Sequence, residues 1–448
     1  MHVAGVNLFE YPARAHARKF MARIGDTYRS TTELRKPFAH RVSHGALGRF
    51  GPLYWEEAPE IDLDYHVRHS ALPKPGGYRE LFTLVSRLHS TLLDRNRPLW
   101  EVHLIEGLKN RQYAVYTKMH HATVDGVGGI HMTEASCSPD PGAAMNLSPM
   151  SSEVHRRYKA SHRRAKRAPS EPSELDLKTI AELFRAQLDT TAHFMGVVRH
   201  YAATWLGFGG GLAVPWRHVP HTMMNTRVSG ARQFVARSWS IDRVSAVSKA
   251  AGVTINDVVL AMCSGALRRY LDDQGEQPEH SLRALVPVSV REQDDFDSPV
   301  AVSYIVADLG TRHDDPAARL DAIVESTRAG KAMLGELTSS EASLYASLIQ
   351  TPLFISSLMG VADWFPPVST VISNIPGPRE QLYWNGAPLL ANYPVSAVFH
   401  GFALNITFVS YHGNLDFGVI ACRDTVPHTD RLMDHLEESL AELEALAW

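Results

Sequence analysis

The sequence predicts an α/β protein of two domains with mixed sheets, and three observations lead to this prediction. The chain has 448 residues, more than one hydrophobic core usually serves, so we expect two domains. Hydrophobic residues make up 44% of the chain and charged residues 21%, as in ordinary globular proteins. Strand-like and helix-like segments occur in both halves without a shared repeat, which favours two α/β domains.

The first predicted domain spans residues 1–140. Val3–Phe9 and Tyr113–His121 are rich in aromatic and β-branched residues, which predicts strands. Tyr78–Leu93 repeats its apolar residues at helical spacing, which predicts an amphipathic helix. This part of the chain is therefore expected to form an α/β domain.

Residues 141–230 are predicted to be a linker and a crossover helix between the domains. Residues 137–152 are rich in Ser, Pro and Gly, and residues 156–167 (RRYKASHRRAKR) are strongly basic, so both indicate a solvated segment. Residues 177–206 predict the crossover helix. The glycine run that ends it, residues 208–211 (FGGG), is expected to be a hinge.

The second predicted domain spans residues 231–448. Strands are predicted at residues 234–239, 284–290, 302–309, 370–373, 403–411 and 415–422. Helices are predicted at residues 241–251, 256–271 and 430–446, the last of them opened by Thr429.

The most informative motif is HHATVDG, residues 120–126, at the end of the predicted strand of residues 112–119 (QYAVYTKM). Neighbouring residues of a strand point to opposite faces of the sheet. His121 would then share a face with Met119 and Thr117, and His120 would share the other face with Lys118. Only one of the two histidines can face a reacting atom.

The motif resembles the HHxxxDG signature of bacterial wax ester synthase/diacylglycerol acyltransferases, which belong to the superfamily of CoA-dependent acyltransferases and condensation domains that carry HxxxDG. Four further segments resemble blocks of the family and follow its order over nearly the whole chain: PLWE (98–101), NDVV (256–259), VPVS (286–289) and SNIPGP (373–378). Related proteins usually have a further helix ahead of a segment like residues 1–9. Either the natural start therefore lies before Met1, or part of the acyl tunnel differs here.

This resemblance implies both a fold and an activity. The fold would be two chloramphenicol-acetyltransferase-like domains with a substrate tunnel between them and the catalytic histidine at its centre. The activity would be the transfer of a long acyl group from acyl-CoA to a long-chain fatty alcohol, giving a wax ester, or to diacylglycerol, giving triacylglycerol.

Ester formation from a thioester needs a group that takes the proton of the attacking alcohol and returns a proton to the leaving thiolate. An imidazole suits both steps, because its unperturbed pKa lies near 6.5. The resemblance implies that His121 is this base and His120 a supporting residue. The alternative for His121 is a core histidine whose hydrogen bonds are satisfied at a strand end.

The resemblance also implies a structural role for Asp125. In the superfamily this aspartate points away from the substrate and pairs with an arginine, and Arg291 is the best candidate partner. If such a pair is buried, removing one partner would cost about 3 to 5 kcal/mol. Gly126 would allow the turn and a close backbone approach.

The oxyanion of the reaction needs a hydrogen-bond donor, since removing one such donor typically costs about 100- to 1000-fold in rate. Ser373 and Asn374 are candidates, because Pro376-Gly377-Pro378 fixes the chain after them. Asn256, next to Asp257 at a predicted helix N-terminus, is a further candidate. The alternatives are that Asn256 caps its helix and that Asn374 satisfies amides of a turn.

Apolar volume is expected to set the substrate specificity, since each buried methylene contributes about 0.8 kcal/mol. Candidates for the lining of the tunnel are Pro98, Leu99, Trp100, Leu353 and Met359, although all five residues could equally belong to the core.

Composition excludes several other classes. The net charge of -3 gives no case for nucleic-acid binding, and neither CxxC nor HExxH spacing occurs, so we expect no metal and no cofactor, with acyl-CoA as a substrate. Three distant cysteines favour a reducing compartment. Without a signal-peptide pattern at the start, we expect a cytoplasmic protein that can also lie peripherally on the inner membrane or on lipid droplets.

Two other functions stay open. A condensation-type acyltransferase would use a carrier-protein thioester in place of acyl-CoA. A non-catalytic lipid-binding protein would keep its function without His121. The basic run of residues 156–167 could also contact anionic lipid headgroups or CoA phosphates.

Overall fold

A computed structural model describes residues 1–31, 33–44, 53–144, 146–162, 212–289, 302–335, 337, 341, 345, 356 and 363–446. The predicted crossover helix and glycine run lie outside the described residues, as do Arg291, Leu353 and Met359.

The chain folds into two compact units that interleave along the sequence. The first unit comprises Met1–Ser161, Arg227–Ala246 and Ser373–Asp434, and the second comprises His162–Thr226, Val247–Ile372 and His435–Trp448. These boundaries differ from the contiguous domains predicted at residues 1–140 and 231–448. The physical reason is strand pairing, because a segment near residue 390 completes the sheet that begins at residue 2.

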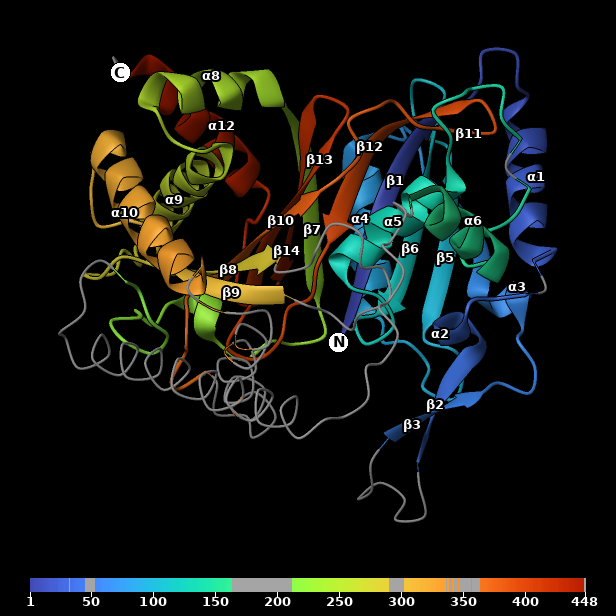
Figure 1. Cartoon of the computed structure of the whole chain (residues 1–448), viewed down its shortest axis with the longest axis horizontal. Helices are drawn as coiled ribbons and strands as arrows, with labels where there is room; N and C mark the ends of the chain where they lie inside the picture. The colour runs from blue at the N-terminus through green and yellow to red at the C-terminus, as the bar shows by residue number, and fades with distance from the viewer. Residues whose placement is uncertain are drawn as a thin grey trace, which may run out of the picture. The chain divides into compact units, whose positions relative to one another are not determined.

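The main sheet of the first unit has six strands in the order β11-β12-β1-β6-β5-β4 (Figure 1). Its strands are β1 (His2–Glu10), β4 (Val67–Ala71), β5 (Trp100–Glu106), β6 (Gln112–His120), β11 (Tyr383–Trp384) and β12 (Ala387–Val395). β1 pairs antiparallel with both β6 and β12, whereas β4 and β5 are parallel. The predicted mixed α/β architecture is confirmed for this unit.

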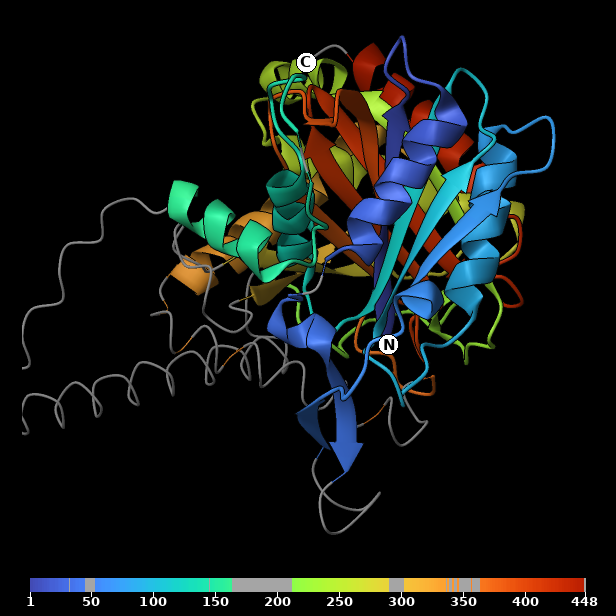
Figure 2. The same ribbon diagram turned by 90° about the vertical axis from the view of Figure 1, so that its right-hand side faces the viewer.

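Side-chain alternation along β6 separates two layers of the core. Tyr113, Val115 and Met119 pack into one hydrophobic cluster, whereas Ala114 and Tyr116 pack into another. The helices of this unit are α1 (Ala17–Arg29), α2 (Lys36–Ala39), α3 (Leu63–His66), α4 (Tyr78–Ser90), α5 (Gly126–Ser136) and α6 (Ser152–His162). A separate hairpin of β2 (His40–His44) and β3 (Leu53–Glu57) extends away from the sheet (Figure 2).

Three more strands of the first unit form an antiparallel set. They are β7 (Arg232–Ser240), β13 (Leu404–Tyr411) and β14 (Asn414–Cys422), and β14 pairs with both of the others. β10 (Thr370–Pro376) passes from the second unit into the first at Ser373.

The second unit combines a small mixed sheet with long helices. β8 (Arg283–Ser289) pairs antiparallel with β9 (Val302–Asp308) and parallel with the start of β10. Its helices are α9 (Ile255–Asp273), α10 (Pro316–Gly335) and most of α12 (Arg431–Ala445), and α8 (Ile241–Ala251) enters it from the first unit.

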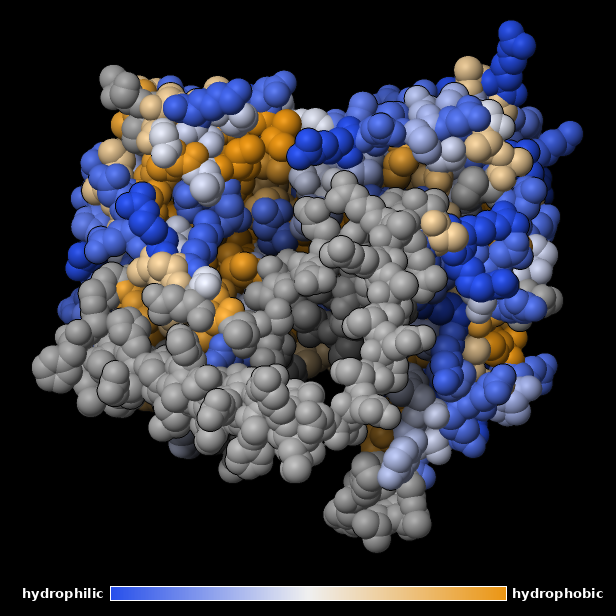
Figure 3. All heavy atoms as spheres, viewed as in Figure 1, coloured by the Kyte–Doolittle hydropathy of each residue, from blue (hydrophilic) through white to orange (hydrophobic). Residues whose placement is uncertain are grey.

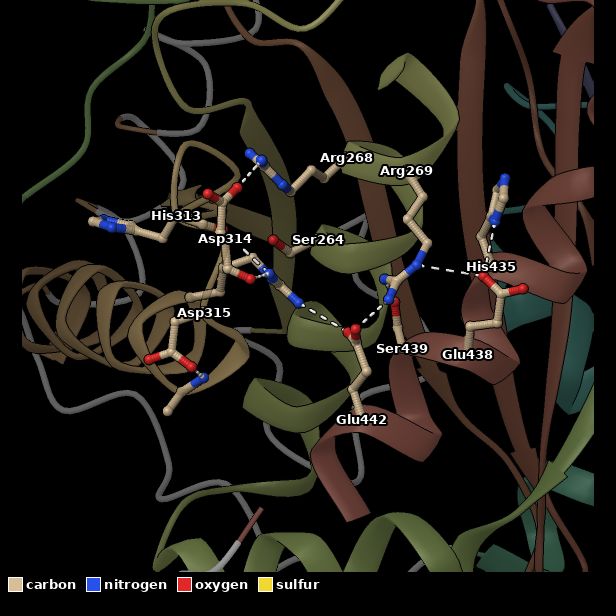
Figure 4. A network of polar contacts seen from close by, with 12 residues as sticks. Ser264, Arg268, Arg269, His313, Asp314, Asp315, His435, Glu438, Ser439 and Glu442 are labelled. Atoms are coloured by element: carbon tan, nitrogen blue, oxygen red, sulfur yellow. Dashed lines mark hydrogen bonds and ion pairs between the residues drawn. The ribbon is translucent and has the colours of Figure 1, made fainter. Parts of the chain in front are cut away.

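Ion pairs tie the helices of the second unit together (Figure 4). Glu442 of α12 pairs with Arg269 of α9 and lies 3.3 Å from Nη2 of Arg319 in α10. Arg319 is buried and also donates to the carbonyl oxygens of His313 and Asp314. Arg319, the buried member of this network, therefore has both a partner of opposite charge and carbonyl acceptors.

Hydrophilic residues cover most of the described surface in the view of Figure 3. Leu53, Tyr54 and Trp55 of the β2–β3 hairpin are exceptions, with 44% to 59% of each residue exposed.

Within the described ranges, no single helix is long and apolar enough to cross a membrane. Only α8 and α9 together, as a bent pair, have the length and apolar composition that a crossing would need.

Candidate active site

A cavity of about 170 Å³ lies in the first unit between α5 and the face of the sheet formed by β12, β1 and β6. Six residues of α5 line it, four of them small: Gly126, Gly129, Thr133 and Ser136, together with Ile130 and Met132. Alternate residues of β1 and β6 form the opposite wall: Val3, Gly5, Asn7 and Phe9, and Val115, Thr117 and Met119. The cavity is slightly larger than the ~150 Å³ that holds one benzene molecule, so it is a small cavity.

His121 lines this cavity directly after the end of β6. Its backbone N–H donates to the carbonyl oxygen of Met1 over 3.2 Å, which fixes the residue at the start of the turn. The imidazole forms no hydrogen bond with any other described residue, so both ring nitrogens are available to a ligand. This arrangement does not match the alternative of a satisfied core histidine.

His120 lies opposite His2 on the neighbouring strand, on the other face of β6. Its Nδ1 accepts from the backbone N–H of Ala122 over 3.2 Å. Burial, the amino group of Met1 and the Arg95 guanidinium lower the pKa of His120 to about 4. The ring is therefore neutral and held in place at neutral pH, as strand alternation predicted for one histidine of the pair.

Asp125 begins α5 as its N-cap. Its Oδ1 accepts from the backbone N–H of Gly128 over 2.6 Å, which satisfies an amide that the first turn leaves free. The residue also contributes to the cavity wall. The predicted partner, Arg291, lies outside the described residues, so the predicted ion pair stays a prediction.

Gly126 is required by packing at the start of α5. A Cβ there would lie 2.7 Å from Cδ1 of Ile375, closer than nonbonded carbon atoms approach. A side chain at position 126 would therefore require the side chain of Ile375 to move.

The two oxyanion candidates of β10 point in opposite directions. Ser373 and Ile375 line the cavity, whereas Asn374 is exposed. This follows from the period of two along a strand. Among these two candidates, only Ser373 shares the cavity with His121.

Asn256 and Asp257 lie in the second unit, in the first turn of α9. Thr254, not Asn256, caps this helix, and Asp257 completes a capping box with Thr254. The buried Asp257 carboxylate also accepts from the hydroxyl of Thr327 over 2.9 Å. The contacts of Asp257 thus hold α9 to α10.

The PLW segment is part of the core of the first unit. The indole N–H of Trp100 donates to the carbonyl oxygen of Phe38, and its ring stacks on His66 with centroids 4.3 Å apart. Pro98, Leu99 and Trp100 are buried and do not line the cavity. The packing interpretation thus describes these three residues, and the tunnel interpretation does not.

Sequence reasoning missed most of the cavity wall. Phe9, Tyr28, Asn392, Thr407 and Trp384 line it, although no motif singles them out. One signal was available: residues 3, 5, 7 and 9 share the strand face that leads to His121, and residues 126, 129, 133 and 136 share one face of a helix. Within the described residues, no group of His, Cys, Asp and Glu could hold a metal ion.

The fold of this chain is shared with solved structures of acyltransferases and condensation domains. The first condensation domain of the calcium-dependent antibiotic synthetase covers 100% of this chain and 91% of its own, with a TM-score of 0.56 and 15% identity, which shows the shared fold. Wax ester synthase/diacylglycerol acyltransferase from Marinobacter aquaeolei VT8 has a TM-score of 0.73 and 36% identity over 99% of this chain and 94% of that chain.

The chain belongs to the wax ester synthase/diacylglycerol acyltransferase family. The model of the family's catalytic domain matches residues 1–259, and that of the WS/DGAT C-terminal domain matches residues 301–444. A Mycobacterium tuberculosis H37Rv protein named as a diacylglycerol O-acyltransferase is 43% identical over 99% of this chain and 95% of its own length. The O-acyltransferase WSD of Acinetobacter baylyi is 38% identical over 100% of this chain and 93% of its own.

Proposed function

We propose that this protein is an O-acyltransferase that moves a long-chain acyl group from acyl-CoA to a long-chain alcohol or to diacylglycerol. One observation carries the proposal: His121 lies in a narrow cavity, with a ring that no described residue engages. The similarity to proteins named as wax ester synthase and diacylglycerol O-acyltransferase supports the substrate classes.

The imidazole of His121 acts as the general base. It removes the hydroxyl proton of the acceptor as the oxygen attacks the thioester carbonyl carbon. The C–O bond forms, the carbonyl π electrons move to oxygen, and the resulting oxyanion is tetrahedral. When the C–S bond breaks, the imidazolium returns the proton to the CoA thiolate, so the histidine ends as it began.

Ser373 is the proposed donor to the oxyanion. It lines the same cavity as His121 and lies on β10, a strand rather than a mobile loop. A hydroxyl held by a strand costs little reorganisation when the negative charge develops.

The experiment is CoA release from palmitoyl-CoA, measured with hexadecanol and separately with dipalmitoylglycerol, with the lipid products resolved by thin-layer chromatography. We expect ester from the wild type and a loss of at least about 100-fold in His121→Ala. His44→Ala, which removes an exposed histidine at the end of β2, is the matched control and should keep full activity. The ratio of the two products places the enzyme between wax ester and triacylglycerol synthesis.

Circular dichroism and a thermal melt of each variant establish that it is folded. A folded His121→Ala protein that retains wild-type turnover would exclude His121 as the base. A folded wild type that makes no ester with either acceptor would overturn the proposed activity.

A further inference from the structure

The hairpin of β2 and β3 protrudes from the first unit (Figure 2). Among the described residues its two strands pair only with each other, and all five residues of β3, Leu53–Glu57, are exposed. An isolated two-stranded hairpin is marginally stable at best in water, because no neighbouring element covers its faces. A hairpin in this position therefore gains stability from a partner that covers it.

The root of the hairpin is held by the core of the first unit. Phe38, two residues before β2, is buried and packs edge-on against Trp100, whose indole N–H donates to the carbonyl oxygen of Phe38. At the end of β3, the backbone N–H of Ala58 donates to the carbonyl oxygen of Ala39 over 2.9 Å. The exposed part of the hairpin is thus carried on a fixed base.

Polarity changes along β3 from its outer end to its root. At the outer end, 59% of Leu53, 55% of Tyr54 and 44% of Trp55 are exposed. Towards the root, the strand continues with two exposed carboxylates, Glu56 and Glu57. Three residue steps of about 3.3 Å separate Leu53 from Glu56, so the apolar end is roughly 10 Å deep.

The exposed aromatic side chains lie on both faces of the hairpin. Trp55 is paired with Val42 on one face and Tyr54 with Ser43 on the other, because neighbouring residues of a strand point in opposite directions. A protein partner that covered one face would leave the aromatic ring of the other face in water. A fluid lipid layer surrounds both faces at once, so this arrangement favours lipid over protein.

The size of the apolar end also argues against a protein partner. Large aromatic side chains present about 150 to 250 Å² each, so exposures near one half give roughly 300 Å² for Leu53, Tyr54 and Trp55 together. A stable protein interface buries about 800 Å² on each partner. Contact with a lipid layer requires less area, because interfacial segments are held by apolar side chains that enter it by only about 5 to 10 Å.

We propose that the outer end of this hairpin inserts into the surface of a phospholipid bilayer, with Leu53 in the outer hydrocarbon, Tyr54 and Trp55 at the level of the headgroups, and Glu56 and Glu57 in water. The depth of roughly 10 Å matches that of interfacial segments. Tyrosine and tryptophan are enriched at this level, because each combines an apolar ring with a polar O–H or N–H group.

The docking goes beyond the proposed function and stands on the hairpin alone. If the protein also has that function, docking brings it to the phase in which long-chain alcohols and diacylglycerol dissolve.

The charges of the hairpin predict which lipids it binds. The two strands contain one arginine, Arg41, and two glutamates, Glu56 and Glu57, and Arg41 lies 3.3 Å from Glu56. We therefore expect binding to phosphatidylcholine vesicles that contain no anionic lipid, with little loss in about 0.5 M salt. Binding through the basic run of residues 156–167 would instead require anionic lipid and would weaken with salt.

The experiment is flotation of the full chain with phosphatidylcholine vesicles, in which the bound fraction is measured at increasing lipid concentration. In the hairpin variant, Leu53→Ser, Tyr54→Ser and Trp55→Ser are combined, and we expect its partition into vesicles to fall by at least about tenfold.

The matched control removes one leucine and two aromatic residues elsewhere on the surface. It combines Leu92→Ser, Trp364→Ser and Phe365→Ser, whose native residues are 77%, 80% and 63% exposed. This control variant should bind like the wild type, although it loses more exposed apolar surface than the hairpin variant.

A second measurement tests the depth of insertion. The three cysteines of the chain, Cys137, Cys263 and Cys422, are buried, so a cysteine introduced on the hairpin reacts selectively with a polarity-sensitive dye. On Leu53→Cys, vesicles should shift the emission of the dye to the blue and protect it from quenching by aqueous iodide. On Glu57→Cys, the dye should stay accessible to iodide.

The outcomes decide between the hairpin and other surfaces. A wild type that does not float, equal flotation of the wild type and the hairpin variant, or a loss confined to the control variant would overturn the proposal. Binding that requires anionic lipid and disappears with salt would assign the contact to basic residues. Dimers that form without lipid and are lost in the hairpin variant would identify a second copy as the partner.

Circular dichroism establishes that each variant is folded, and if the hairpin variant is not, the dye at position 53 decides the question. Flotation requires no turnover, so the result is independent of whether the protein forms ester.

Discussion

Two helices with similar beginnings have different roles in this protein. α5 begins at an aspartate cap, Asp125, and α9 begins at a threonine cap that Asp257 completes. Behind its cap, α5 presents two glycines, a threonine and a serine to a cavity, along with Ile130 and Met132. α9 instead buries 13 residues, most of them Val, Leu, Met and Ala, and packs against α10.

The difference shows that a capped helix start is not by itself evidence of a site. The amides of both first turns are satisfied by the same chemistry, a side-chain oxygen of a capping residue. The two helices differ in the size of the side chains on the inward face. Small side chains leave a cavity beneath a helix, whereas large ones fill that space. Asn256 and Asp257 belong to α9, whose inward face is packed with large side chains.

Two buried carboxyl groups of the first unit differ in their partners. Glu101 lies 3.9 Å from Nζ of the buried Lys118, which carries the opposite charge. In the first unit, the buried carboxyl of Asp416 has only neutral donors among the described residues, the hydroxyl of Ser238 at 2.6 Å and the backbone N–H of Asn392 at 2.7 Å. We therefore expect the stability of the first unit to depend on pH through Asp416.

The largest predicted effect concerns Asp416. Burial raises the pKa of its carboxyl to about 6, against the opposing hydrogen bonds from Ser238 and Asn392. The unfolded value is about 3.9, so the folded state holds the proton more tightly, and stability falls as pH rises from about 4 through 6. Relative to Asp416→Asn, the wild type should lose about 2 to 3 kcal/mol between pH 4 and pH 7.

Urea unfolding of both proteins at several pH values, followed by the fluorescence of their tryptophans, measures this difference. Using the variant as the reference removes the contribution of all other titrating groups. Parallel curves for the two proteins would show that Asp416 has no unusual affinity for its proton.

The second-largest predicted effect tests the close packing of α9. Gly265 faces α12, and a Cβ there would collide with the hydroxyl of Ser439 and lie 3.1 Å from its Cβ and 3.3 Å from Nη2 of Arg319. Gly265→Ala gains about 1 kcal/mol of helix propensity but incurs about 1 to 3 kcal/mol of overpacking. We expect a net loss of about 1 to 2 kcal/mol, seen as a lower urea midpoint.

Activity per folded molecule should not change in Gly265→Ala, because Gly265 lies in the second unit and does not line the cavity. A variant as stable as the wild type would mean that α9 and α12 adjust to the methyl group, and that the second unit is less rigidly packed than the contacts indicate.

Local sequence patterns predicted part of the fold. β1, β6, β7, β13 and β14 alternate or are rich in β-branched and aromatic residues, and their predicted ranges agree with the structure to within two residues. β12 was not predicted. It contains Asn392 and Pro394, which are uncommon in strands, and it is stabilised by pairing with β1 nearly 400 residues earlier.

The candidate site also has a part that the sequence predicts and a part that it does not. The motif of residues 120–126 is continuous, so its strand, turn and helix start could be worked out from neighbouring residues. The far wall could not, because Phe9, Tyr28 and Trp384 meet only after three distant segments have packed together. A face of small residues on α5 indicates a cavity only when the opposing strand is known.

The smallest predicted effect is a gain in stability instead of a loss. It allows the same substitution to be compared in α5 and in α9. Gly129→Ala places the same methyl group in α5 that Gly265→Ala places in α9, but here a Cβ meets nothing within 4 Å. The exchange should therefore raise stability by up to about 1 kcal/mol, through helix propensity alone, and raise the urea midpoint. If Gly129→Ala lowers stability as Gly265→Ala does, the inward faces of α5 and α9 do not differ in packing as the contacts describe, and the cavity beneath α5 would be closed in solution.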